Sequence, residues 1–110
     1  MKKLSPRTLE IVKDMRALLD GPDKWTTGWF ARDSEKRTVV ATSSHAVCWC
    51  LSGAFMKVHG PLCSFEYNEL AQYFPNRSLA NWNDSQHIWE DIRDRLDSII
   101  RDNERVRFHK

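Results

Sequence analysis

Apolar residues three and four positions apart indicate an amphipathic helix near the start of the chain. Its buried stripe comprises Leu9, Val12, Met15 and Leu19. Ser5 is a suitable N-cap, Pro6 favours the first helical position, and Gly21-Pro22 ends the periodic segment. The pattern therefore predicts a helix from Ser5 to Asp20.

The same spacing later in the chain predicts a helix from about Ser85 to Asn103, with Asp84 as its N-cap. The buried stripe of this helix comprises Ile88, Ile92, Leu96, Ile99 and Ile100. Its outer face carries charges of alternating sign, as in Asp91 and Arg95, which is typical of a solvated surface. The basic tail over residues 105–110 is predicted to fray.

A different pattern runs from Thr26 to Ala41. This segment is rich in Trp, Phe, Thr and Val and is interrupted by a polar run, a composition that predicts a β-hairpin. Charged side chains are rarely buried without partners, so we expect the hairpin tip to be exposed. The charged residues of the tip are Arg32, Asp33, Glu35, Lys36 and Arg37. Because loops on a rigid scaffold are frequent recognition sites, Arg32, Lys36 and Arg37 are candidate binding residues.

Two further helices are predicted between the hairpin and the last helix. The first begins at Ser43 or Ser44 and reaches about Val58, and its apolar residues cover most of its circumference, which indicates a central helix. Gly53 lies within it. Because Gly in a helix interior costs roughly 1 kcal/mol relative to Ala, we expect another element to pack closely there. The second helix runs from Ser64 to Phe74, with Phe65 available for burial.

Residues 77–84 are expected to form an irregular connection or a single turn before the last helix. The chain has 110 residues, 41% of them hydrophobic, which suits one core and is too short for two. We therefore predict a single domain over residues 1–110. Its class is α+β, mainly helical, with about four helices and one β-hairpin between the first and second helices.

The charge of the chain limits the classes of partner that the protein can bind. The formal net charge is only +2, with basic and acidic residues interleaved, so the chain has no field that would favour nucleic acid or a membrane. The second and third helices could imitate a helix-turn-helix. However, the third helix carries Glu66 and Glu69 and no Lys or Arg, which would repel phosphates, so nucleic acid is an improbable partner. The remaining classes of partner are a protein or a small molecule, and the sequence identifies neither. No pattern in the sequence indicates an oligomeric state.

No apolar run reaches the ~18–20 residues that span a bilayer, and Met1-Lys2-Lys3 leads into a polar helix start instead of an apolar signal region. The three cysteines, Cys48, Cys50 and Cys63, form no stapling framework and are expected to be reduced. A cytoplasmic protein is the expectation.

The cysteines also support one enzymatic hypothesis. Cys48 or Cys50 could act as a nucleophile, with His45 or His87 as base and Asp84 or Asn83 orienting the imidazole. The apolar neighbours of both thiols favour an inert, neutral sulfur, so no catalytic residue is assigned. A cysteine-dependent hydrolase or transferase centred on Cys48 or Cys50 is therefore the alternative function.

Residue spacing argues against a zinc site. His45 with Cys48 and His59 with Cys63 have the residue types of two ligand pairs. On one continuous helix over residues 45–59 the two pairs would be about 21 Å apart at 1.5 Å per residue, much farther than ligands of one zinc ion. We therefore expect neither a metal nor a cofactor.

Three elements occur in a fixed order along the chain. They are Trp25 followed by Ala31-Arg32-Asp33, Ala46 with Trp49-Cys50-Leu51-Ser52-Gly53-Ala54, and Ser78-Leu79-Ala80-Asn81-Trp82-Asn83-Asp84. Together they resemble an uncharacterised family of small domains, a domain of unknown function met in actinobacteria and in phages. Where that family commonly has a Gly in the hairpin turn, this chain has Glu35-Lys36-Arg37. The resemblance implies a fold and a phage or mobile-element setting, and it implies no reaction.

Trp82, Asn83 and Asp84 are the remaining candidate binding residues, and two interpretations of them stay open. In the first, the indole stacks on a flat group of a ligand or partner while the amide and carboxylate supply directed hydrogen bonds. In the second, which we favour, Asp84 caps the last helix, Asn83 satisfies loop backbone groups and Trp82 fills the core. The overall hypothesis is a small non-enzymatic binding or interaction protein. The resemblance extends it to a phage- or mobile-element-encoded protein that acts on a host component.

Overall fold

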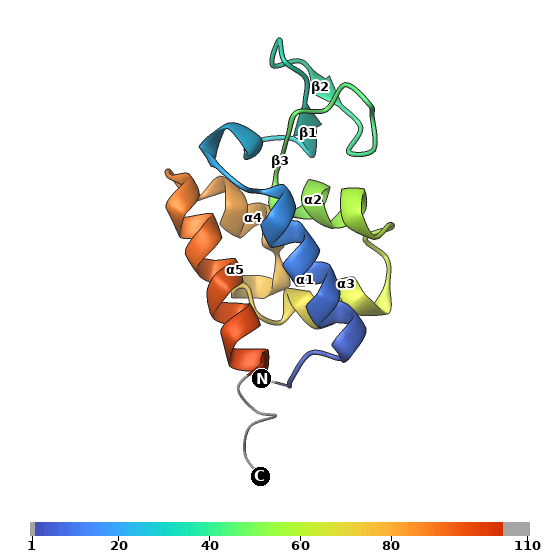
Figure 1. The fold of residues 1–110 in the computed structure, drawn as a ribbon, viewed down its shortest axis with the longest axis vertical. Helices are drawn as coiled ribbons and strands as arrows, with labels where there is room; N and C mark the ends of the chain where they lie inside the picture. The colour runs from blue at the N-terminus through green and yellow to red at the C-terminus, as the bar shows by residue number, and fades with distance from the viewer. Residues whose placement is uncertain (1, 105–110) are drawn as a thin grey trace.

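The computed structural model describes residues 2–104, so the prediction for the tail over residues 105–110 lies outside the described residues. The α-helices are α1 (Pro6–Leu18), α2 (Leu51–Val58), α3 (Phe65–Ala71), α4 (Leu79–Asp84) and α5 (Trp89–Glu104). The strands are β1 (Ala31–Arg32), β2 (Thr38–Val39) and β3 (Cys48–Trp49), and two 3-10 turns are η1 (Pro22–Lys24) and η2 (Pro75–Arg77). The predicted class, mainly helical α+β, is confirmed. Figure 1 shows the helices grouped into one body with the small sheet at one end.

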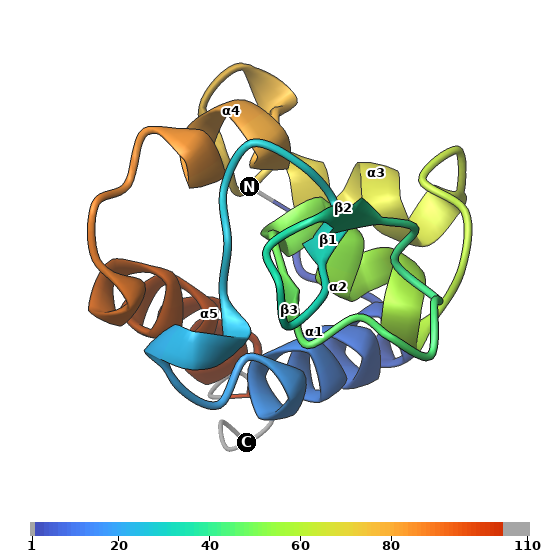
Figure 2. The same ribbon diagram turned by 90° about the horizontal axis from the view of Figure 1, so that it is seen from above.

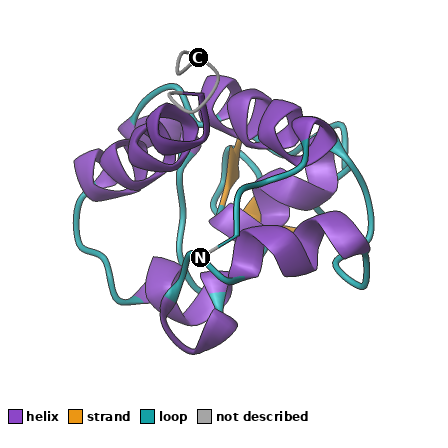
Figure 3. Ribbon diagram, turned by 90° about the horizontal axis from the view of Figure 1, so that it is seen from below, coloured by secondary structure: helices purple, strands orange, loops and turns teal. Residues whose placement is uncertain are grey.

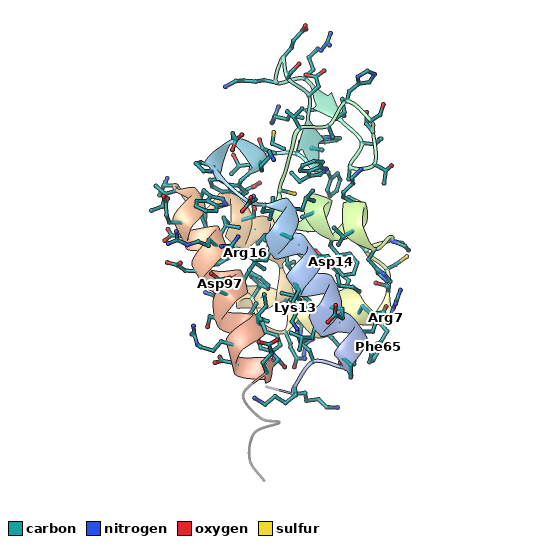
Figure 4. All side chains as sticks on the ribbon, in the orientation of Figure 1. Arg7, Lys13, Asp14, Arg16, Phe65 and Asp97 are labelled. Carbon is teal, nitrogen blue, oxygen red and sulfur yellow. The ribbon has the colours of Figure 1, made fainter. Side chains whose placement is uncertain are left out.

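The helical body is organised around α1, which packs against α2, α3 and α5. Figure 3 shows these helices around a common interior. The largest fully buried apolar side chains include Met15, Leu51, Phe55, Leu70, Leu79, Ile92 and Leu96. Arg16 of α1 and Asp97 of α5 point toward one another in Figure 4, and their Nε and Oδ1 atoms are 2.8 Å apart.

The N-terminus of α1 has the predicted cap. Ser5 Oγ accepts a hydrogen bond from the Thr8 backbone N–H, and Pro6 occupies the first turn. The Ser5 backbone N–H and hydroxyl both donate to Glu69 of α3, at 3.1 and 2.8 Å, and the buried Thr8 hydroxyl donates to the same carboxylate. A carboxylate is favourable at the positive end of a helix, so the cap also joins α3 to α1.

The predicted hairpin is present as β1 and β2, which pair antiparallel between α1 and α2. A third strand completes the sheet in the order β2-β1-β3, with Ala31 opposite both Val39 and Trp49. The prediction of one helix over residues 43–58 is wrong in its first half, because Cys48 and Trp49 form β3 and the helix begins at Leu51. Pairing with β1 satisfies the backbone there, and the Trp49 indole donates to the Ala41 carbonyl at 2.9 Å.

The predicted start of the last helix is also wrong. Residues 79–84 form a separate helix, α4, capped by the Ser78 hydroxyl, and α5 begins only at Trp89. Asp84 is therefore the last residue of α4 and not the N-cap of α5. Ile88 lies in the connection and is 52% exposed, contrary to its predicted place in the buried stripe. Phe65, expected to be available for burial, points outward from α3 and is 66% exposed (Figure 4).

The hairpin tip differs from expectation at Asp33, which is 8% exposed, and at Arg32, which is only partly exposed. Its carboxylate accepts hydrogen bonds from the Glu35 and Arg37 backbone N–H groups and from Arg37 Nε, all at 2.9 Å. The backbone N–H of Arg37, above all, lowers the pKa of the Asp33 carboxyl, against the opposing effect of burial. The turn places Lys36 in the left-handed region, with φ of 68°. Paired in this way, Asp33 can be buried because its charge has partners.

Candidate functional site

A small hollow lies where the segment between η1 and β1 passes α4, an arrangement visible from above in Figure 2. We call it the loop–α4 cleft. Its volume is about 170 Å³, and its lining residues are Gly28, Trp29, Phe30, Cys50, Ala80 and Asp84. Three parts of the chain meet there: the loop over residues 26–30, the start of α2 and one side of α4. The cleft brings Asp84, a predicted binding residue, together with residues that were not predicted.

Asn83 connects the three parts of the chain that form the cleft. Its side chain is fully buried, and Oδ1 accepts from the Trp25 indole at 2.8 Å and from the Leu51 backbone N–H at 3.1 Å. Its Nδ2 donates to the Thr26 carbonyl at 3.2 Å and to Asp84 Oδ1 at 3.0 Å. An amide side chain offers two donor hydrogens and two acceptor lone pairs, and this one uses all four. Asn83 thus ties the loop, the first turn of α2 and the end of α4 to one another.

Asp84 forms one wall of the cleft. Its Oδ1 accepts from the Gly28 backbone N–H at 3.1 Å as well as from Asn83. Gly28 has φ of +84°, a conformation that residues with a side chain rarely adopt. Among the described residues, no ion pair involves Asp84, and its side chain is exposed. The carboxylate therefore lies at the surface without an ion-pair partner among the described residues.

Trp29 and Phe30 form the aromatic wall. Trp29 is 48% exposed, and its ring lies edge-to-face with Phe30 at a centroid distance of 5.7 Å. The Phe30 carbonyl approaches Gly53 of α2, where a Cβ would lie 1.9 Å from the oxygen. The close approach predicted at Gly53 is confirmed. Sequence reasoning missed this wall, because it treated Trp29 and Phe30 as part of the predicted hairpin, whereas β1 begins only at Ala31.

Cys50 lies at the floor of the cleft. It is the N-cap of α2, and its Sγ accepts from the Gly53 backbone N–H at 3.3 Å. Burial raises the pKa of the Cys50 thiol, and the nearby Asp84 carboxylate acts in the same direction, outweighing the hydrogen bond from Gly53. The thiol is therefore neutral at physiological pH. Neither His45 nor His87, the predicted bases, lines the cleft.

A second hollow of about 530 Å³ lies beneath the hairpin and is lined in part by Arg32, Lys36 and Cys48. The Arg32 guanidinium donates to the Thr26 hydroxyl and to the Thr27 and Lys36 carbonyls, each at 3.2 Å. Arg32 thus braces the loop against the hairpin. Arg37 lies outside this hollow.

Trp82 faces a different environment. The Arg95 guanidinium lies over its ring at 4.7 Å from the centroid, and Phe74 meets it edge-to-face at 5.4 Å. Trp82 and Arg95 also line an open hollow of about 510 Å³ with Asp91 and Asp94. The structure therefore does not gather Trp82, Asn83 and Asp84 into one binding edge: Asn83 is buried and donates to Asp84 at the cleft, whereas Trp82 lies against Arg95 and Phe74.

Comparison with known proteins places the chain in a family. A family model described as "Family of unknown function (DUF6197)" matches residues 4–102. The chain belongs to this family. The predicted resemblance to an uncharacterised family of small domains is thereby confirmed. No curated protein and no solved structure matches the chain.

The part of the DUF6197 domain that the structure describes holds no group of three or more His, Cys, Asp or Glu side chains placed to bind a metal ion. His59 instead pairs with Glu66, with Nε2 and Oε1 3.5 Å apart. The 21 Å separation argued for a continuous helix does not apply, since residues 45–50 are not helical. No helix among the described residues is both long and apolar enough to cross a membrane.

Proposed function

We propose that this DUF6197 member is a non-enzymatic binding protein that holds a partner protein at the loop–α4 cleft. One observation carries the proposal: Trp29 exposes about half of its surface, 48%, beside a hollow whose walls are joined by the hydrogen bonds of the buried Asn83. Large aromatic side chains next to pockets are the residues that contribute most binding energy at protein interfaces. Rigid walls add to this, because a preformed site loses less entropy on binding.

The candidate residues take different parts in this proposal. Asp84 contacts the partner, whereas Asn83 and Arg32 hold the loop that carries Trp29. Lys36 and Arg37, at the hairpin tip, serve as peripheral contacts. Trp82 makes no contact with the partner, since its ring is covered by Arg95.

The cellular setting follows the same reasoning. The three cysteines are free, which suits a reducing compartment, so we place the protein in the cytoplasm. The resemblance to phage domains extends the proposal to a phage- or mobile-element-encoded protein whose partner is a host component.

The proposal is tested with peptides selected from a random displayed library on the wild-type protein. The selected peptides should bind Trp29→Ser about tenfold or more weakly, as for an interface hot spot. Val40→Ser is the matched control, because Val40 is 68% exposed and does not line the cleft. It should bind the peptides like wild type. Peptides that bind Trp29→Ser and wild type equally would remove the cleft from the proposed function.

The alternative is a cysteine-dependent enzyme centred on Cys48 or Cys50, which the neutral, buried Cys50 thiol makes less favourable. Native protein treated with iodoacetamide at neutral pH should be labelled first at the exposed Cys63 and last at Cys50. Preferential labelling of Cys50 or Cys48 over Cys63 in the native state would favour the enzyme instead.

A further inference from the structure

We infer that the loop–α4 cleft recognises a basic side chain, arginine or lysine, of the partner protein. This inference rests on the proposed function and specifies the chemistry of its partner. The size of the cleft is the first argument. At about 170 Å³ it is smaller than the roughly 300–1,000 Å³ of pockets that enclose small-molecule ligands, so a single side chain suits it better.

The charge of Asp84 is the second argument. Its Oδ1 is engaged by two neutral donors, the Gly28 backbone N–H and the Asn83 amide. Oδ2 has no hydrogen-bond partner among the described residues, and no described cation pairs with the carboxylate. The wall thus presents an oriented carboxylate oxygen without an ion-pair partner, which can accept a charge-assisted hydrogen bond from a guanidinium or ammonium group.

The aromatic wall is the third argument. Trp29 is 48% exposed and lines the same cleft as Asp84, and Trp is the ring that attracts cations most strongly through its negative face. Phe30 and Ala80 supply apolar surface for the aliphatic stem of an arginine or lysine, whose charged head then reaches Asp84. The guanidinium of Arg32, the nearest basic residue along the loop, lies next to Gly28, but it donates its hydrogen bonds to Thr26, Thr27 and Lys36 and forms no ion pair with Asp84. A small cleft lined mostly by apolar groups and one carboxylate fits a long basic side chain.

Two short peptides separate charge from shape. The probes are acetyl-Ala-Arg-Ala-amide and the same peptide with citrulline, which keeps the length and planarity of arginine without its charge. Binding is followed by NMR at the Trp29 indole N–H and the Gly28 amide. The arginine peptide should shift both signals with a dissociation constant in the millimolar range, and the citrulline peptide should bind about fivefold more weakly.

Asp84→Asn removes the charge while keeping an oxygen that accepts from Gly28 and Asn83, so the fold should be retained. It should weaken the arginine peptide about fivefold and leave the citrulline peptide unchanged. Asp91→Asn is the matched control, because it changes the net charge equally at an exposed residue outside the cleft. Its binding of the arginine peptide should equal that of wild type. Equal binding of the two peptides, or equal weakening by Asp84→Asn and Asp91→Asn, would overturn the inference.

The library selection keeps this inference distinct from the proposed function. Peptides that require Trp29, lack basic residues and tolerate Asp84→Asn would refute recognition of a basic side chain and leave the binding function intact. Peptides indifferent to Trp29 would refute both.

Discussion

Gly53→Ala tests the contact on which both the fold and the cleft depend. In most helices this change stabilises, because Ala has a higher helix propensity than Gly by about 1 kcal/mol. At residue 53 the added Cβ would lie 1.9 Å from the Phe30 carbonyl oxygen and 2.7 Å from its carbon. Real Cβ contacts are essentially never shorter than 3.0 Å, so the loop that carries Trp29 and Phe30 must move away from α2.

The expected magnitude follows from three contributions. Overpacking of a tight contact costs about 1–3 kcal/mol. Movement of Phe30 also breaks the hydrogen bond that its carbonyl accepts from the Cys50 N–H at 3.2 Å, which costs about 1 kcal/mol. The gain in helix propensity offsets about 1 kcal/mol. Gly53→Ala should therefore lower the free energy of unfolding by about 1–3 kcal/mol, or the melting temperature by roughly 5–15 °C.

Thermal and urea unfolding of Gly53→Ala beside wild type measure this change. Asn68→Ala, at an exposed position of α3, is the control for helix propensity and should alter stability by no more than about 0.5 kcal/mol. A Gly53→Ala protein that melts at or above the wild-type temperature would show that Phe30 does not lie against α2. The position of the aromatic wall, and with it the cleft, would then be wrong.

Three further changes test other parts of the structure. Lys36→Gly should raise the free energy of unfolding by about 0.5–1.5 kcal/mol in urea titrations, because Gly adopts the left-handed conformation at φ of 68° without strain. A loss of stability would contradict this account of the turn. Asn83→Leu should cost about 2–4 kcal/mol in a thermal melt, since it leaves the Trp25 indole and the Leu51 N–H without their acceptor, and a cost below 1 kcal/mol would refute the bridging role. The pKa of Asp33 is lowered in the fold, so its contribution to stability is complete above the reference value of 3.8 and is lost as pH falls through the lower folded value. Wild type should accordingly lose more stability than Asp33→Asn on acidification from pH ~6 to ~2.5, and parallel pH–stability curves would contradict the lowered pKa.

Local sequence signals predicted an element correctly where its hydrogen-bond partners lie close in sequence, or where any apolar surface can cover its buried face. The stripe of α1, its Ser5 cap and Pro6 depend on neighbouring residues, and each was predictable. The stripe of α5 was predicted for Ile92, Leu96 and Ile99, because any apolar surface can cover it. The close approach at Gly53 was predicted because a glycine inside a helix is costly without such a contact.

Residues 43–50 show where local signals fail. Their apolar run suits a helix or a buried strand equally, and periodicity cannot separate the two over so short a segment. Pairing with β1 decides for a strand, because the backbone groups of Val47 and Cys50 find partners at Arg32 and Phe30, which are 15 and 20 residues away. The prediction that Asp84 caps α5 was wrong for a related reason. The Asp84 carboxylate accepts a hydrogen bond from Gly28, which is 56 residues away in sequence.

The sequence by itself determined the class of the fold, most of its buried faces and Asp84 as a residue of interest. Only the tertiary structure decided that Asp84 meets Trp29 across a cleft. Asn83 shows the physical reason, because its four hydrogen bonds join the loop, α2 and α4, and three of them cross 32 to 58 residues of chain. A buried amide is stable only where all of its hydrogen-bond partners meet it. The way in which the loop, α2 and α4 meet at Asn83 also decides how much of Trp29 remains exposed.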